Sequence, residues 1–272
     1  MSGPISQHFR FLTSVCVVAG ATVAAPISAH ADVVPHQATY TLRMAEVTGP
    51  SAFNDVSGAA VNLLEKTCDG WVIDEQIVMT MLTNAGGAIN REMTFKATES
   101  LNGDSFRFRS VSDTDGTIEE YKGSARVRAD GSAEAEFITP RPFEMPLPKG
   151  VNFYVSTTEW LLKLAKSGAK TGQTVSFDGS DADGPHKMTA FILPDFGARD
   201  ALKGDPALLS GKAWDVRLAF FKLNEQAGQP DFEIALRLLE NGIITRFKLI
   251  FEDMTIDQLL DDVLPATEEK CG

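Results

Sequence analysis

Hydrophobic and polar residues alternate with a period of two along much of the chain. In SFRFRSV, residues 105–111, Phe106 and Phe108 fall on one face of an extended segment and two arginines fall on the other. This alternation is typical of a strand that is buried on one face. Further strand-like runs, rich in β-branched and aromatic residues, occupy 124–138, 174–193, 214–223, 232–240 and 243–256.

Turn signals separate these runs. Asp130-Gly131 lies at the centre of 124–138, and Asn241-Gly242 precedes the last run. Both pairs favour a two-residue type I′ hairpin turn, because Asn, Asp and Gly tolerate the positive φ angles that this turn requires. Short strands with a turn signal about every ten residues predict an all-β fold, which is a sandwich, a barrel or a spiral.

One short helix is predicted after residue 156. Ser156 and Glu159 have the spacing of a capping box, and Gly168 fits the position just beyond the last turn. A helix of about ten residues is unstable alone, so we expect its apolar face to pack against the sheet. Four residues form that face: Trp160, Leu161, Leu164 and Ala165.

A proline-rich segment, 140–150, precedes the helix and divides the strands into two sets, 35–140 and 170–258. One interpretation of this division is a domain boundary. Each set, however, has too few strands to remove its own exposed edges. We therefore favour a single β domain that is interrupted by a helical crossover.

The N-terminal residues have the three regions of a secretory signal peptide. Arg10 precedes an apolar run at 11–25, and the small residues Ala29 and Ala31 flank His30 at an expected cleavage site. Cleavage would remove residues 1–31 and leave a mature chain of 32–272. The alternative is an uncleaved N-terminal anchor. The mature chain has no further apolar run long enough for a membrane-spanning helix.

The chain is acidic, with a net charge of −12 at pH 7. Negative charge repels nucleic acid phosphates and anionic lipid surfaces. We therefore expect no nucleic acid partner. A less specific interpretation is that the acidity keeps an exported protein soluble.

After cleavage, Cys68 and Cys271 are the two remaining cysteines. An even number of cysteines in an oxidising compartment favours a disulfide. This bond would close a loop of about 200 residues and stabilise the fold by roughly 5 kcal/mol in the chain-entropy model. Two separate thiols are the alternative. A redox role is disfavoured because the chain has no Cys-x-x-Cys motif.

Residues that could carry catalysis or hold a metal are sparse. The mature chain has two histidines, His36 and His186, and lacks the Gly-x-Ser-x-Gly motif of many hydrolases. The loop 178–184, DGSDADG, resembles part of a calcium loop, but Ala190 stands where the bidentate Glu should be. We expect no enzymatic activity, no cofactor and no metal.

An apolar cluster surrounds the start of the predicted helix and forms a candidate ligand rim on a curved sheet. The alternative is that these residues seal one end of the core. The cluster consists of Phe143, Met145, Leu147, Val151, Phe153 and Tyr154.

Several short stretches, taken in order, resemble the EipB family of periplasmic cell-envelope integrity proteins of alphaproteobacteria, long classed as a domain of unknown function. The resemblance covers nearly all of 35–271. It rests on the order of the stretches rather than on one motif. They are 36–42, 68–71, 99–103, 147–150, 175–180, 214–221, 230–232, 241–242 and the terminal Cys271.

The resemblance implies an antiparallel, spiral-like broken β-barrel with one short helix in the crossover between two strand sets. It implies a disulfide between Cys68 and Cys271 and a single EipB-like domain over 32–272. It further implies a non-enzymatic periplasmic protein that maintains the integrity of the Gram-negative envelope. We expect this protein to be a monomer. The expected partner is an envelope protein, such as a repeat-containing periplasmic protein, or the cell wall.

Two other functions remain open. One is a periplasmic carrier that holds lipid or lipoprotein acyl chains inside an incompletely closed barrel. The other is a hydrolase that uses His186 with an acidic neighbour.

Overall fold

Strands dominate the residues that the structure describes, in agreement with the predicted all-β class. The structure is a computed structural model that describes residues 33–193, 202–223 and 228–271, so the predicted signal peptide lies outside the described residues. The elements, in chain order, are β1 (His36–Val47), β2 (Phe53–Lys66), β3 (Gly70–Thr83), β4 (Ala88–Ser100), β5 (Ser105–Thr114), β6 (Thr117–Val127), β7 (Ala133–Thr139), β8 (Phe143–Leu147), β9 (Val151–Asn152), α1 (Tyr154–Lys166), β10 (Thr171–Ser176), β11 (His186–Leu193), β12 (Ala213–Lys222), β13 (Phe232–Leu239), β14 (Ile244–Ile250) and β15 (Met254–Pro265).

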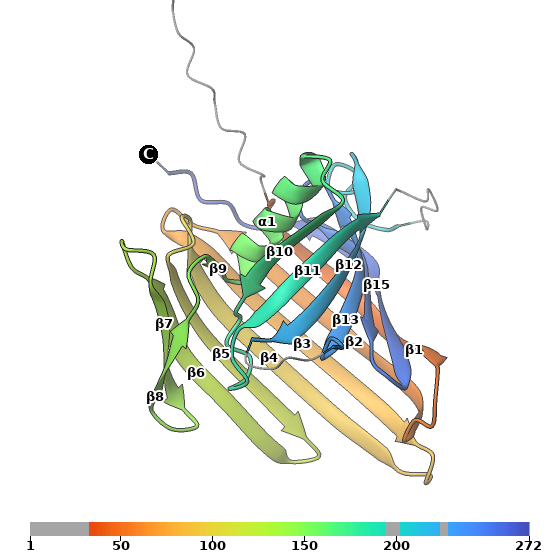
Figure 1. The fold of residues 1–272 in the computed structure, drawn as a ribbon. Helices are drawn as coiled ribbons and strands as arrows, with labels where there is room; N and C mark the ends of the chain where they lie inside the picture. The colour runs from red at the N-terminus through yellow and green to blue at the C-terminus, as the bar shows by residue number, and fades with distance from the viewer. Residues whose placement is uncertain (1–32, 194–201, 224–227, 272) are drawn as a thin grey trace, which may run out of the picture. The chain divides into compact units, whose positions relative to one another are not determined.

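The described strands form one barrel-like sheet with a seam (Figure 1). The strand order is β8 to β1 in descending sequence order, then β15 to β9, so the first strand pairs with the last. The edges of this 15-stranded sheet are β8 and β9, yet only residues 148–150 separate them in the chain. The sheet must therefore curve round until its two edges meet, and the seam lies between them.

The helix is the crossover that the sequence predicted. β9 and β10 pair in parallel, whereas the other neighbouring strands pair in an antiparallel manner. A parallel pair cannot be joined by a tight hairpin, because the chain must return to the same end of the sheet. Helix α1 makes this return beside the seam (Figure 1).

Both strand sets and the helix share one hydrophobic core. Its largest fully buried side chains include Phe106 of β5, Phe153 before α1, Leu162 of α1 and Met188 of β11. The rings of Phe106 and Phe153 stack with centroids 5.1 Å apart, which ties the start of the helix to β5. Burial of each such side chain stabilises the folded protein by about 1.5–3 kcal/mol.

The prediction that Ser156 and Glu159 form a capping box at the start of the helix is wrong. The helix begins at Tyr154, and Ser156 lies in its first turn, where its Oγ accepts a hydrogen bond from the Phe153 N–H (2.7 Å). The acceptor for the helix N-terminus comes from β4 instead. The carboxylate of Glu99, which is buried, accepts hydrogen bonds from the backbone N–H groups of Val155 (2.6 Å) and Ser156 (2.9 Å).

The helix also buries a wider face than predicted. Leu161 and Ala165 are buried as expected, but so are Val155 and Leu162, because α1 contacts the core on more than one side. Trp160 and Leu164 are partly buried and pack against it. The predicted end is confirmed, since Gly168 has φ 77° and its N–H donates to the Ala165 carbonyl (3.2 Å).

Both predicted hairpins are present, but their turns are longer than two residues. β6 and β7 are joined by 128–132, with the Arg128 N–H donating to the Ser132 carbonyl (2.7 Å). β13 ends at Leu239 and β14 begins at Ile244. The type I′ backbone occurs instead at Asp115-Gly116, with φ of 49° and 86°, between β5 and β6.

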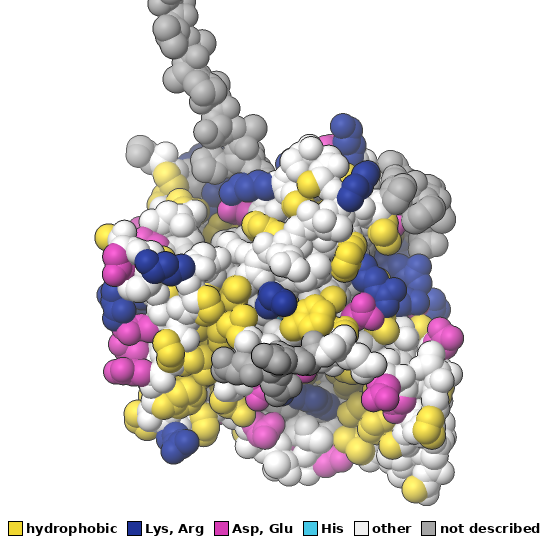
Figure 2. All heavy atoms as spheres, viewed as in Figure 1, with side chains coloured by type: hydrophobic (Ala, Val, Ile, Leu, Met, Phe, Trp, Pro, Cys, Tyr) yellow, Lys and Arg dark blue, Asp and Glu magenta, His cyan; other side chains and the backbone are white. Residues whose placement is uncertain are grey.

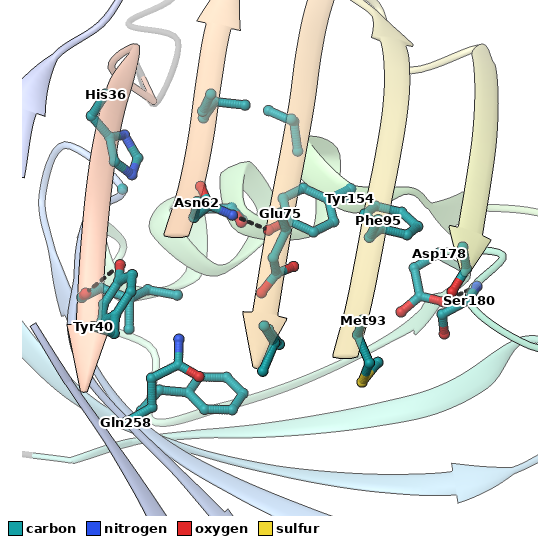
Figure 3. Close-up of a pocket in the computed structure, with 18 of the residues that line it drawn as sticks. His36, Tyr40, Asn62, Glu75, Met93, Phe95, Tyr154, Asp178, Ser180 and Gln258 are labelled. Carbon is teal, nitrogen blue, oxygen red and sulfur yellow. Dashed lines mark hydrogen bonds between the residues drawn. The ribbon is translucent and has the colours of Figure 1, made fainter. Parts of the chain in front are cut away.

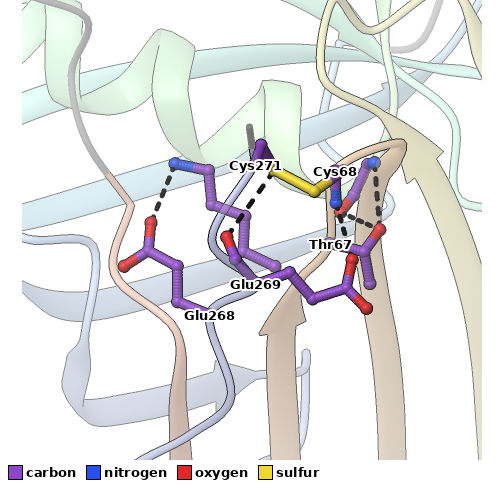
Figure 4. The surroundings of a disulfide bond; sticks show 7 residues. Thr67, Cys68, Glu268, Glu269 and Cys271 are labelled. Carbon is purple, nitrogen blue, oxygen red and sulfur yellow. Dashed lines mark hydrogen bonds and ion pairs between the residues drawn. A yellow bond between two sulfur atoms is a disulfide. The ribbon is translucent and has the colours of Figure 1, made fainter.

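The C-terminal segment completes the sheet. Strand β15 extends to Pro265, beyond the predicted strand run that ended at residue 256, and lies between β1 and β14. Beyond it, Glu269 donates its backbone N–H to the Lys66 carbonyl (2.9 Å). Cys68 and Cys271 form the disulfide that the sequence analysis expected, with a Cα–Cα distance of 5.5 Å (Figure 4).

Replacing Cys68 by serine is expected to lower the free energy of unfolding by up to roughly 5 kcal/mol, because the unfolded chain regains the entropy of a loop of about 200 residues. Urea denaturation of the oxidised proteins measures this loss. Cys271→Ser serves as the matched variant and is expected to show the same loss. Equal denaturation midpoints for wild type and both variants would contradict the stabilising role.

Replacing Glu99 by glutamine is expected to lower the free energy of unfolding by about 1.5–3 kcal/mol, because one of two helix N–H groups loses its charged acceptor. Thermal denaturation measures the difference. The control is Glu92→Gln, an exposed glutamate on the same strand, which is expected to leave the midpoint unchanged. A Glu99 variant as stable as that control would show that the carboxylate does not hold the helix.

Candidate functional site

A cavity of about 390 Å³ lies on the inner side of the sheet (Figure 3). Its lining comes mainly from β1 to β5, the start of α1, the loop between β10 and β11, and the strands β14 and β15. Elements from both strand sets therefore build it, and the sheet must close before the cavity exists.

One part of the wall is apolar. These side chains belong to inward-facing positions of β2, β3 and β4 and of β14, with β1 and β15 between the two groups of strands. Such a lining is typical of small-molecule sites, which combine an apolar wall with a few polar groups. The apolar wall consists of Leu64, Ile77, Met93, Phe95, Ile244, Phe247 and Leu249.

Hydrogen-bonded side chains and one carboxylate supply the polar part. Asn62 on β2 donates from Nδ2 to the hydroxyl oxygen of Tyr154 (2.8 Å), and Glu75 on β3 lines the cavity beside this pair. The Tyr40 hydroxyl donates to the Ile244 carbonyl (3.0 Å). Figure 3 shows the Glu75 carboxylate extending into the cavity between these groups.

The titratable groups of the cavity are shifted mainly by burial. Burial, with a smaller contribution from the negative charge of Asp178, raises the pKa of Glu75 to about 7. Burial also raises the pKa of Tyr154 and of Tyr40. It lowers the pKa of His36, whose Nδ1 lies 2.8 Å from the Val34 carbonyl oxygen, so this imidazole is neutral at pH 7.

An apolar wall with a few polar groups is suited to binding a small molecule. Within the described part of the chain, no group of three or more His, Cys, Asp or Glu side chains could hold a metal ion. The candidate histidine of a hydrolase, His186, lies at the start of β11, where its ring contacts Phe220 and Phe232 edge-on. It does not line the cavity. The absence of a metal, a cofactor and an activity remains a prediction.

The structure places most of the candidate ligand rim in the core at the seam. Leu147, Val151 and Phe153 are buried, and Phe143 stacks on Phe137 with centroids 4.3 Å apart. Met145 lies beside Gly184 of the loop between β10 and β11. Of the six residues, Tyr154 alone lines the cavity.

The loop 178–184, which the sequence compared with a calcium loop, covers part of the cavity. Asp178 and Ser180 line it. The Asp178 and Asp181 side chains accept hydrogen bonds from the backbone N–H groups of Ser180 (2.9 Å) and Asp183 (2.8 Å), which stabilise turns.

Sequence reasoning missed Glu75, although a signal for it exists. The alternation in β3 places Trp71, Ile73, Glu75 and Ile77 on one face, and the first two are buried. A carboxylate on an otherwise apolar strand face needs a polar neighbour or a cavity. The polar side chains near it, Tyr154 and Asn62, come from other elements, so the sequence could not identify them.

Comparison with known proteins gives one family and one fold. The model of the EipB-like family matches residues 27–266. A solved structure from Brucella abortus, described as a beta-barrel-like protein of a domain of unknown function, matches with a TM-score of 0.75 and 24% identity. The match covers 85% of this chain and 98% of the chain from Brucella abortus. None of the curated proteins compared with the chain matches it.

The stability of the protein is expected to fall as pH rises from about 4.5 to about 7. The pKa of Glu75 is raised in the folded state, so the folded protein binds its proton more tightly than the unfolded chain does. The stabilisation is complete below the unfolded pKa and is lost as pH passes the folded pKa. It corresponds to up to about 3 kcal/mol.

Glu75→Gln is expected to reduce this dependence, which burial of Glu99 and Asp181 also contributes to, and to be the more stable protein at pH 8, as measured by urea denaturation across pH. The other titratable groups that face Glu75 are Asp178, Tyr154, Tyr40 and His36. Glu119→Gln, on the exposed part of β6, is the control and should retain the wild-type slope. An unchanged slope in the Glu75 variant would show that other groups cause the dependence.

Proposed function

Because the chain belongs to the EipB-like family, we propose that the protein maintains cell-envelope integrity from the periplasm, without catalysing a reaction, and that its cavity holds the apolar chain of an envelope lipid or lipoprotein. The alphaproteobacterial envelope is the setting that the sequence resemblance suggested.

The cavity is the observation that carries this proposal. Its volume of about 390 Å³ falls within the range of about 300–1,000 Å³ that is usual for small-molecule sites. Binding of an apolar ligand to this wall is favoured by about 25 cal/mol of free energy for each Å² of apolar surface that is removed from water. A hydrocarbon chain with a polar headgroup matches a wall that is apolar over most of its area and polar beside Glu75.

Two features support a periplasmic setting. The N-terminal pattern of Arg10, an apolar run and small residues is typical of an export signal. The Cys68–Cys271 disulfide is stable in an oxidising compartment and would be reduced in most cytosols.

Among the described residues, the structure has no helix that is long and apolar enough to cross a membrane.

A second candidate function is docking of an envelope protein at the seam. β8 is an edge strand of the described sheet, and an edge strand offers backbone groups to which a partner strand can be added. Ile138, near this edge, is 61% exposed. Figure 2 shows hydrophobic side chains gathered on the surface over β7 and β8.

Met93→Trp separates the two candidates, because it fills the cavity and leaves the seam unchanged. A deletion strain that carries this variant is expected to remain sensitive to detergent, and the exported variant is expected to carry no lipid in native mass spectrometry. Val78→Trp is the matched control, since Val78 is 49% exposed on the neighbouring strand. It is expected to restore tolerance and to retain the lipid.

Full detergent tolerance with Met93→Trp would contradict a role for the cavity and would favour docking at the seam. Normal tolerance in the deletion strain itself would contradict the envelope role. Thermal denaturation of both variants shows whether the protein is folded when tolerance is lost.

A further inference from the structure

The charged side chains that line the cavity all carry the same sign. Glu75 and Asp178 are carboxylates, and none of the lining residues, which all lie in the described part of the chain, is Lys or Arg. His36 does not balance them, because burial lowers its pKa and keeps its ring neutral. The cavity therefore carries negative charge on a protein that is itself acidic.

The outer face of the same sheet follows a different pattern. Asp74, next to Glu75 in the chain, points outward and forms an ion pair with Lys96 (2.6 Å). Asp257 has Lys248 (3.5 Å) and Arg246 (3.4 Å) around it. Among the ion pairs formed by described residues, none includes Glu75 or Asp178.

The two carboxylates line the same cavity, where Glu75 is half-buried and Asp178 is exposed. They come from β3 and from the loop between β10 and β11, and both extend into the cavity (Figure 3). The charge of Asp178 contributes to the raised pKa of Glu75. Two carboxylates in one cavity without a cation repel each other, and a positive charge in the cavity reduces this repulsion.

We propose that the cavity selects amphiphiles with a cationic headgroup, such as a primary ammonium group, and that Glu75 and Asp178 receive this headgroup while the apolar wall holds the hydrocarbon chain. The proposal rests on the proposed function, since it names the class of ligand that the same cavity holds.

The geometry also provides hydrogen-bond acceptors for an ammonium group. Each carboxylate offers two oxygens, and the side-chain carbonyl of Gln258 and the hydroxyl of Ser180 are further polar groups of the lining. A carboxylate or phosphate headgroup would instead add negative charge to a site without a compensating cation. Fatty acids and anionic phospholipids are therefore expected to bind more weakly.

Three ligands with the same chain test this selectivity: dodecylamine, dodecanol and dodecanoate. Isothermal titration calorimetry of the delipidated full mature protein at pH 8 is expected to give an affinity for dodecylamine at least tenfold higher than for dodecanoate, with dodecanol between them. A tenfold ratio corresponds to about 1.4 kcal/mol. Met93→Trp is expected to abolish binding of all three, which places them in the cavity.

Glu75→Gln and Asp178→Asn are each expected to reduce the ratio between amine and carboxylate at least threefold, while dodecanol still binds. Retained dodecanol binding shows that the cavity still holds a hydrocarbon chain in each variant. Asp74→Asn, which removes a carboxylate from the outer face of β3, is the matched control and should keep the wild-type ratio. This control shows how much of the preference for the amine arises from the net charge of the protein alone.

The outcomes distinguish this inference from the proposed function. Dodecanoate that binds as tightly as dodecylamine overturns the headgroup selectivity, while the cavity still holds a chain. A preference for the amine that persists in both carboxylate variants overturns the assignment to Glu75 and Asp178. Binding of none of the three ligands overturns the proposed function together with this inference.

Discussion

The pairing of the first strand with the last is the contact on which the rest of the structure depends. β1 and β15 are joined along almost their full lengths, from His36–Pro265 to Val47–Met254. This ladder turns two open meanders into one sheet whose edges meet at the seam. Because it joins residues more than 200 positions apart, its loop-closure entropy is large. The nearby disulfide ties the same chain end to the turn after β2, and so reduces the entropy that folding must overcome.

The helix depends on this closure. A segment of this length has little helical stability of its own, so its packing and its cap decide whether it forms. Both come from distant strands: Glu99 of β4 accepts the first N–H groups, and Phe106 of β5 stacks on Phe153. The same contacts place Tyr154 on the inner side of the sheet. Helix and cavity are therefore one arrangement, in which the residue that begins the helix also lines the cavity beside Glu75.

The cavity follows from a local departure from the hydrophobic pattern. Most inward-facing positions carry apolar side chains that fill the interior. At Tyr40, Asn62 and Glu75, neighbouring strands β1 to β3 place polar groups on this inner face instead. Such groups are costly to bury unless they are hydrogen-bonded or in contact with water or a ligand. The chain satisfies some of them internally and leaves others facing the open volume, which is typical of a binding site rather than of a core.

Short-range patterns in the sequence determined the all-β class, most of the strands, the end of the helix at Gly168 and the two cysteines available for a disulfide. These features depend on alternation, on turn residues and on residue counts, which are properties of neighbouring positions. The start of the helix, the extension of β15 to Pro265 and the cavity were decided by tertiary structure. Glu99 meets the helix across 56 positions, and Asn62 meets Tyr154 across 92. No local pattern encodes such a separation, because these contacts exist only once the sheet has closed and has brought distant strands to the same inner face.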